Sequence, residues 1–210
     1  MNRQQTTTLA FAAIGATVLA FSLRLEPGSD LFVVSTLTLA AVWAVGAFAA
    51  GPLHLGRLGP QLGAFAEGRR PIVTSLGVGA LLAGVFVLGA LVVREIEPLR
   101  VAVTEVVQYA DQGAGPLILL VTVLNGLAEE IFFRGAVYDA VPRRKVLATT
   151  VLYVVATALT GNVMLAFAAI VIGAVTGWQR HFTGGILAPM LTHITWSVSM
   201  LYALPALFPA

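Results

Sequence analysis

Two adjacent acids and an arginine interrupt an apolar stretch, at Glu129, Glu130 and Arg134. A carboxylate at membrane depth is costly unless it is paired, hydrated or bound to a cation, so these residues point to a functional site. On a helix, Glu130 and Arg134 are one turn apart and can neutralise each other. Glu129 lies about 100° round the helix from Glu130 and faces another neighbour. We therefore expect a partner for Glu129 from another helix, a water molecule or a metal ion.

A simpler interpretation places these charges at a helix end, where they would be hydrated at the membrane interface. Two features of the sequence argue against it. Ile131, Phe132 and Phe133 separate the acids from Arg134, and apolar residues resume at Ala136. The pattern therefore favours a buried charged cluster.

The composition indicates a membrane protein. Of 210 residues, 58% are hydrophobic and 10% charged, and the mean hydropathy is +0.91. A chain with so little polar surface is predicted to be an all-α, polytopic bundle in the lipid bilayer. The net charge of +2 indicates no nucleic-acid partner. Cysteine is absent, so a metal would need histidine, carboxylate and water ligands.

Hydrophobic runs predict about seven membrane spans and one interfacial helix. The spans are expected at residues 7–23, 31–50, 71–93, 116–137, 146–159, 163–178 and 186–204, with the interfacial helix at 99–110 and a polar connection at 51–70. We divide this single membrane domain into residues 1–114, the N-terminal helices, and 115–210, which carries the polar motifs.

Small residues four apart predict close helix packing in the membrane. The pairs are Gly79 with Ala83, Ala80 with Gly84, and the series Ala169, Gly173 and Gly177.

Basic residues predict the orientation, because cytoplasmic loops of membrane proteins are enriched in arginine and lysine. An N-terminus in the cytoplasm places most of them inside, namely Arg3, Arg57, Arg69, Arg70, Arg143, Arg144, Lys145 and Arg180. Only Arg24, Arg94 and Arg100 then lie outside. The C-terminus is predicted outside, in a multi-pass protein of the cell membrane.

Polar residues from three spans fall at similar depths in this topology. With a rise of about 1.5 Å per residue, Glu129 and His193 lie roughly 13 Å from the cytoplasmic face and Thr157 roughly 16 Å. Ser197 is one turn beyond His193. We therefore expect a site in the cytoplasmic leaflet, in a hydrated hollow that opens toward the cell interior. The alternative is that His193 bonds a carbonyl, and that Thr157 and Ser197 bond their own helices.

A glutamate and a histidine in a partly dehydrated pocket can activate water, either by general-base action or by holding a cation that lowers the pKa of the water. A hydroxyl from Ser197 or Thr157 could stabilise an oxyanion. These groups predict a hydrolase that acts on a bond brought into the membrane. Tyr153 and Trp196 are expected to be packing or interface residues.

The polar residues resemble two motifs of the CAAX protease and bacteriocin-processing family, also called Abi or type II CAAX prenyl endopeptidase-like intramembrane proteases. Glu129, Glu130 and Arg134 are similar to its EExxxR motif, and His193 with Ser197 to its last motif, a histidine followed four residues later by Asn, Asp or Ser. The resemblance covers roughly residues 115–200.

The resemblance implies an intramembrane endopeptidase that hydrolyses membrane-associated protein or peptide substrates. Glu129 would be the base or a metal ligand, Glu130 with Arg134 an assisting or structural pair, His193 a ligand or electrostatic aid, and Ser197 an oxyanion donor. Zinc is a candidate cofactor, with Glu129 and His193 as ligands.

The chain departs from the middle motif of the family, an aromatic residue with a histidine four residues later. Tyr153 matches the aromatic residue, but Thr157 stands where the histidine is expected. Threonine is a poor zinc ligand. One interpretation is a protease whose glutamate-activated water depends less on metal. The other is a relative without proteolysis that serves as a membrane scaffold, an immunity factor or a partner of another membrane protein.

A proton-coupled transporter would also use a buried glutamate, arginine and histidine. Such a protein predicts duplicated halves or broken helices, and the sequence has no visible repeat. The hydrolase therefore remains the preferred interpretation.

Overall fold

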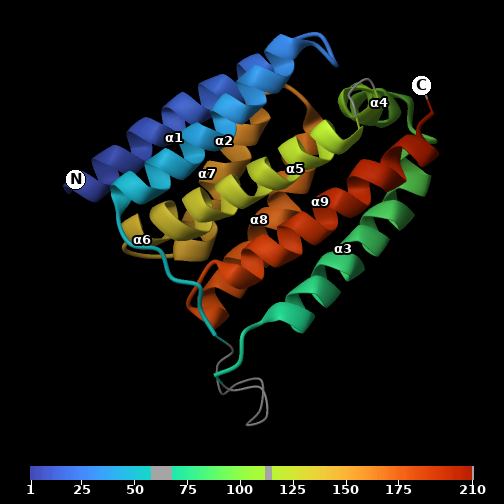
Figure 1. Ribbon diagram of the computed structural model, residues 1–210. Coiled ribbons are helices and arrows are strands. Elements are labelled where there is room, and N and C mark those ends of the chain that lie inside the picture. Colours follow the sequence, from blue (N-terminus) through green and yellow to red (C-terminus); the bar gives the residue numbers. More distant parts are fainter. Residues whose placement is uncertain (58–67, 112–114, 210) are drawn as a thin grey trace.

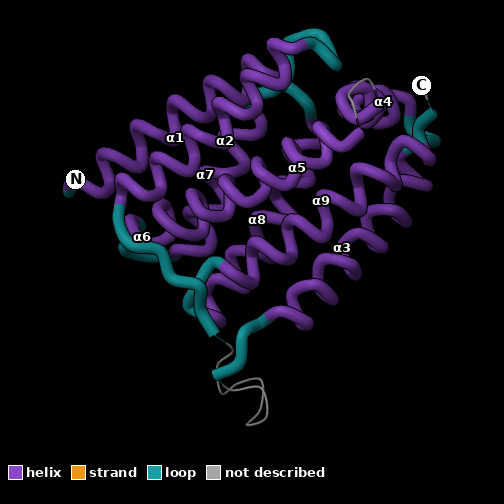
Figure 2. Tube along the Cα trace, in the orientation of Figure 1, coloured by secondary structure: helices purple, strands orange, loops and turns teal. Residues whose placement is uncertain are grey.

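The computed structural model describes residues 1–57, 68–111 and 115–209. Within these ranges the regular elements are helices joined by loops, and no strand is drawn among them (Figure 2). In chain order the helices are α1 (Arg3–Ser22), α2 (Asp30–Ala50), α3 (Ile72–Val93), α4 (Glu97–Asp111), α5 (Gly115–Glu130), the π-helix η2 (Ile131–Val137), α6 (Tyr138–Ala140), α7 (Lys145–Ala158), α8 (Val163–Thr183) and α9 (Leu187–Leu207). The predicted all-α fold is confirmed for the described residues.

The long helices lie side by side in one bundle (Figure 1). The closest neighbours are α3 with α9, α7 with α8, and α1 with α2. Helix α4 is seen nearly end-on and runs across the others at the end where α3 finishes, and the two chain termini lie at opposite ends of the bundle (Figure 1). We call the end near Met1 the N-terminal end and the end near α4 the α4 end.

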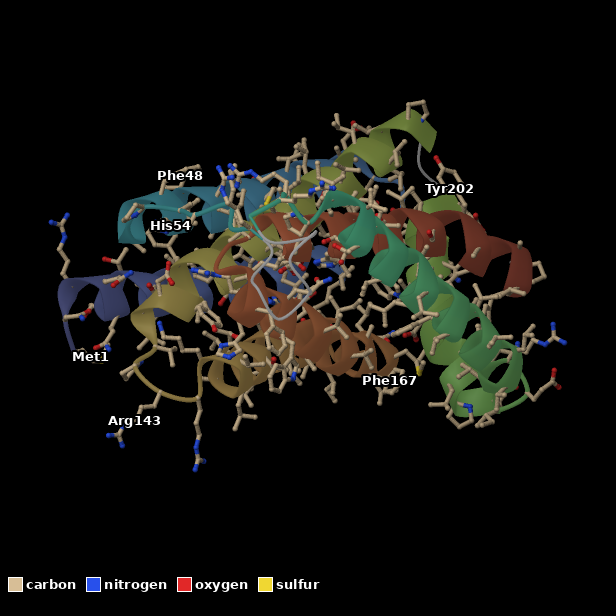
Figure 3. The ribbon with its side chains drawn as sticks, turned by 90° about the horizontal axis from the view of Figure 1, so that it is seen from below. Met1, Phe48, His54, Arg143, Phe167 and Tyr202 are labelled. Carbon is tan, nitrogen blue, oxygen red and sulfur yellow. The ribbon has the colours of Figure 1, made fainter. Side chains whose placement is uncertain are left out.

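Length and hydropathy identify an integral membrane protein. Five segments among the described residues are long and apolar enough to cross a bilayer, namely α1, α2, α3, the continuous α5–η2–α6 segment Gly115–Ala140, and α8. Apolar side chains cover the outside of the bundle, among them Phe48 and Phe167 (Figure 3). Helix α7 is apolar but shorter, and α9 is not among the five. The count of seven spans therefore stays a prediction.

Small residues bring the helices together much as their spacing predicts. A side chain at Gly79 would meet the backbone oxygen of Thr192 in α9 at 2.7 Å, and Ala83 is buried on the same face. One at Gly177 would meet Val146 in α7 at 3.0 Å. The other predicted pair, Ala80 with Gly84, is exposed on the outside of α3.

The predicted boundaries differ most at α8, which continues beyond residue 178 to Thr183. Gly184 ends it in the left-handed conformation, with φ 67°. The described start of the predicted connection 51–70 forms backbone hydrogen bonds with the end of α8 and the loop that follows it. These bonds are Arg57 N to Thr183 O at 2.8 Å and Ile186 N to His54 O at 2.8 Å. Residues 58–67 of that connection lie outside the described ranges.

The division at residue 114 stays a prediction, and residues 112–114 lie outside the described part. Helices from the two sides pack together, since α1 contacts α7, α2 contacts α5 and α3 contacts α9. Asn162 also ties α4 to the start of α8. Its side-chain oxygen accepts from the backbone N–H of Met164 and Leu165, and its amide nitrogen donates to the Ala102 carbonyl at 2.7 Å.

Candidate active site

The acid pair lies near the middle of the bundle, and its two members have different surroundings. Glu130 is completely buried, and so is Arg134. Arg134 Nε lies 3.3 Å from Glu130 Oε2, which forms the ion pair expected from their spacing. Glu130 Oε1 lies 2.8 Å from His193 Nδ1 in α9. We call Glu130, Arg134 and His193 the charge cluster.

The charge cluster is built at a change of helix type. Directly after Glu130 the α-helix α5 widens into η2, which carries Arg134. Short π-helical turns are uncommon and are found mostly at functional sites, because they redirect side chains within a continuous helix. The guanidinium of Arg134 lies over the Tyr153 ring, 4.8 Å from its centroid. This cation–π contact packs η2 against α7.

A second arginine supports η2 from α8. The buried Arg180 donates from Nε to the Arg134 carbonyl oxygen at 2.7 Å and from Nη2 to Asp139 at 2.9 Å. Its guanidinium also lies 4.8 Å from the centre of the Tyr138 ring. A π-helix shifts the backbone hydrogen-bond pattern, so this donor satisfies a carbonyl at membrane depth. Arg180 thereby fixes the segment that holds Arg134.

Glu129 faces the opposite way, and its side chain is 15% exposed. Tyr153 in α7 donates its hydroxyl to Glu129 Oε2 at 2.7 Å. His193 Nε2 lies 3.9 Å from the same oxygen. The partner that Glu129 lacks in its own helix is thus supplied from α7, with the imidazole of α9 beside it.

His193 stands between the two acids. A carboxylate paired with an arginine accepts hydrogen bonds, so the short contact to Glu130 assigns a proton to Nδ1 of His193. The other ring nitrogen then faces Glu129. At 3.9 Å the two atoms do not hydrogen-bond directly, and a separation of this size accommodates a bridging water.

Glu129, Tyr153 and His193 line a cavity of about 300 Å³, which we call the site cavity. Thr157 and Ser197 also line this cavity. Four residues predicted for the site and the neighbouring Tyr153 therefore meet in one space. The Thr157 hydroxyl donates to the Tyr153 carbonyl of its own helix at 2.9 Å. In the structure the Thr157 hydroxyl thus donates to its own helix rather than into the cavity, where an oxyanion donor would act. Ser197 remains the candidate.

Two residues have a role at the site that the sequence did not assign to them. Tyr153 was expected to be a packing or interface residue, but its hydroxyl is bonded to Glu129. Asn125 also lines the site cavity, with its amide nitrogen donating to the Val121 carbonyl and its oxygen buried without a partner. It precedes Glu129 by four residues on the same helix face. That spacing is the signal that could have found it.

The donor set does not fit a zinc ion held by three protein ligands. Glu129 and His193 Nε2 face the cavity, but the oxygens of Glu130 are directed to His193 and Arg134. Thr157 occupies the place of the third ligand and bonds its own helix. In the described ranges, no group of three His, Cys, Asp or Glu side chains is arranged to hold a metal ion.

A second, larger cavity of about 560 Å³ adjoins the site cavity, and we call it the apolar cavity. It lies among α3, α4, α5, α8 and α9 and is lined mainly by valine, leucine and aromatic side chains. Thr122, Trp196 and Ser197 line both cavities. An apolar chamber therefore adjoins the polar groups of the site.

The site cavity extends in the direction opposite to the one expected. The sequence predicted a hollow opening toward the N-terminal end. The described lining residues instead run from the middle of the bundle to the α4 end, where Leu23, Tyr109 and Thr160 belong to the lining. Counting residues from a helix end gives the depth of a group but not the side on which its neighbours leave space, which explains the error.

Comparison with known proteins points to the segment of the chain that carries these site residues. A family profile described as type II CAAX prenyl endopeptidase, Rce1-like, matches residues 112–199. No curated protein and no solved structure gives a significant match. The matched residues contain the acid pair, Arg134, Tyr153, Thr157, His193 and Ser197. The resemblance to the CAAX protease family is therefore confirmed over this segment.

Proposed function

We propose that this protein is an intramembrane endopeptidase that cleaves membrane-associated peptides with a water molecule activated by Glu129. The observation that carries the proposal is the meeting of Glu129, Tyr153 and His193, from three helices, at the inner end of one cavity. Neighbouring helices fix each of these side chains. Such preorganisation is what general-base catalysis requires.

The proposed position of the water lies between Glu129 and His193 Nε2. The carboxylate oxygen of Glu129 accepts hydrogen bonds, and so does Nε2 of a neutral His193 whose proton is on Nδ1. The water therefore donates one hydrogen bond to each of these two atoms. Its lone pairs are then free for a substrate carbonyl in the cavity. Tyr153 holds the Glu129 carboxylate in place through its hydrogen bond.

The reaction proceeds by addition and elimination. Glu129 takes a proton from the water as its oxygen bonds to the carbonyl carbon, and the carbonyl oxygen becomes an oxyanion that Ser197 stabilises by donating a hydrogen bond. The carbon–nitrogen bond then breaks, and Glu129 returns the proton to the leaving nitrogen. One water is consumed, and a carboxylate and an amine are formed.

The adjoining apolar cavity suits the apolar part of a membrane-anchored substrate. It shares Thr122, Trp196 and Ser197 with the site cavity. A substrate whose anchor or apolar side chains enter this chamber would present its peptide bond to Glu129, and burial of the apolar part would contribute to binding. Asn125 offers an oxygen to a backbone N–H of the bound peptide.

Cleavage of membrane-anchored fluorogenic peptides in proteoliposomes tests the proposal. We expect Glu129→Gln to lower kcat by about 1,000-fold, within the usual contribution of a general base. Arg143→Gln, which neutralises an exposed charge at the opposite end of the bundle from the cavities, is the matched control and should retain full turnover. Equal turnover in Glu129→Gln and the native protein would reject Glu129 as the base.

The replacement of the family histidine by Thr157 favours a second candidate function. The protein would then be a scaffold, an immunity factor or a subunit of a membrane complex without hydrolytic activity. The same assay separates the two, because a scaffold shows no turnover in the native protein with any peptide that an active relative cleaves.

A further inference from the structure

The direction in which the site cavity extends limits how a substrate can reach Glu129. Glu129, Tyr153 and His193 form its inner end, and Leu23, Tyr109 and Thr160 lie toward the α4 end. The residues of the apolar cavity come from the same half of the bundle, including the last turns of α3 and the outer part of α9. Both spaces therefore lie on the α4 side of the site.

The other side of the site is filled. Glu130, Arg134 and Phe132 are completely buried behind Glu129. Beyond them Arg180 closes the packing with its bonds to the Arg134 carbonyl and Asp139. A peptide approaching from the N-terminal end would have to displace these buried ion pairs, which is strongly unfavourable.

The distribution of charges relates the two ends to the two faces of a membrane. In Figure 3, Met1, His54 and Arg143 lie toward one end of the bundle and Tyr202 toward the other. Basic residues gather at the N-terminal end, and among the described ones outside the buried core these are Arg3, Arg57, Arg69, Arg70, Arg143, Arg144 and Lys145. Because basic loops stay in the cytoplasm, the α4 end belongs outside.

We infer that the site is entered from the extracytoplasmic side, through the α4 end, and that its substrates are anchored peptides whose scissile bond lies on that side of the membrane. The direction of entry follows from the cavities and the packing behind Glu129. The substrate class rests in addition on the proposed proteolytic function.

The charge around this entrance narrows the substrate class. Acidic side chains outnumber basic ones at the α4 end, with Glu26, Asp30, Glu95, Glu97, Glu105 and Asp111 against Arg24, Arg94 and Arg100. Two of these acids pair with arginines, Glu95 with Arg94 and Glu97 with Arg100. The remaining acids favour a peptide that carries positive charge outside the membrane.

Labelling of single cysteines tests the direction of entry, because the native chain has no cysteine. Thr122→Cys places a thiol in the site cavity, and Arg143→Cys places one on the exposed N-terminal end. Leu88→Cys, on the lipid-facing side of α3, is the matched control without access to water. Each variant is treated with a membrane-impermeant maleimide in right-side-out and inverted vesicles.

We expect Thr122→Cys to react only in right-side-out vesicles, Arg143→Cys only in inverted vesicles, and Leu88→Cys in neither. Reaction of Thr122→Cys and Arg143→Cys from the same face would overturn the inference. Reaction of Arg143→Cys only in right-side-out vesicles and of Thr122→Cys only in inverted ones would overturn the assigned membrane side. Reaction of Thr122→Cys only in detergent would show that neither face gives access, and would overturn the inference as well.

A pair of substrates tests the second half of the inference. Two anchored peptides carry the same cleavable sequence on the outer or the inner face of sealed proteoliposomes with defined protein orientation. We expect cleavage of the outer peptide only, with a lower KM when lysines replace glutamates beside the cleaved bond. Cleavage of the inner peptide alone would reject the assigned side of the substrate. If neither peptide is cleaved but Thr122→Cys is labelled from outside, the proteolytic function is rejected and the direction of entry is retained.

Discussion

The two sides of the acid pair differ in almost every physical respect. On the Glu130 side, Glu130, Arg134 and His193 are buried, paired and backed by Arg180. On the Glu129 side, the carboxylate is partly exposed in a cavity and accepts a short hydrogen bond from Tyr153. Neighbouring glutamates of identical chemistry are thus assigned separate roles by their surroundings.

Under the proposed function, this contrast explains how a carboxylate can stay reactive at membrane depth. The charge cluster pairs Glu130 with Arg134 and holds His193, so Glu129 does not have to serve as the counter-charge of the arginine. We therefore expect substitutions on the Glu130 side to affect mainly folding, and substitutions on the Glu129 side to affect mainly turnover. Substitutions at Arg134, Ser197, Tyr153 and Thr157 test that division.

The largest effect is expected on the Glu130 side. Arg134→Met removes the cationic partner of a completely buried carboxylate, which typically costs about 3–5 kcal/mol of stability. Chemical unfolding in detergent micelles measures the loss. Arg143→Met, on an exposed loop, should leave the unfolding curve unchanged, and similar curves for the two variants would contradict a structural role for Arg134.

On the cavity side, Ser197→Ala should lower kcat about 100-fold with little change in KM, because an oxyanion donor acts mainly in the transition state. The measurement is steady-state cleavage of an anchored peptide, with the unfolding midpoint recorded in parallel. Ser199→Ala is a matched control, since that hydroxyl bonds the Thr195 carbonyl of its own helix. A loss of activity in both variants would count against Ser197 as the donor.

A smaller effect is expected at Tyr153. Tyr153→Phe keeps the ring beneath Arg134 but removes the hydrogen bond to Glu129, and we expect kcat to fall about 10-fold, since bonds to charged groups are worth about 1.5–3 kcal/mol. The free energy of unfolding should fall by no more than that amount. A retained kcat would show that Glu129 needs no positioning from α7.

The smallest effect is expected at Thr157. Thr157→Val removes a hydroxyl that bonds only its own helix, so kcat should stay within about three-fold of the native value. Thr157→His instead adds a third donor beside Glu129 and His193. Elemental analysis after purification should find stoichiometric zinc in the histidine variant and not in the native protein. Stoichiometric zinc in both proteins would contradict the conclusion that the native chain lacks a third zinc ligand.

The sequence predicts the elements that local patterns encode. Apolar length and composition predict the helices, and the spacing of small residues predicts a close helix contact at Gly79, which in the structure is made with α9. Equal depth predicts that Glu129 and His193 belong to one layer, and the two residues lie near each other in the structure. These features depend on periodicity and counting, which a single sequence contains.

Other features depend on tertiary packing. The π-helix at Arg134 is supported by a hydrogen bond from Arg180, which lies 46 residues further along the chain. The role of Tyr153 depends on the rotation of α7 relative to α5, and the direction of the cavities depends on which side of the acid pair is filled. None of these has a local pattern in the sequence.

The most direct test of the division between the two acids is thermal unfolding of Glu129→Gln and Glu130→Gln in the same detergent. Glu130→Gln should lower the unfolding midpoint by several degrees, because it leaves Arg134 buried without a counter-charge. Glu129→Gln should leave the midpoint unchanged or raise it, since a carboxylate without a cationic partner is removed from a largely dehydrated site. A midpoint lowered as much by Glu129→Gln as by Glu130→Gln would contradict separate roles for the two acids.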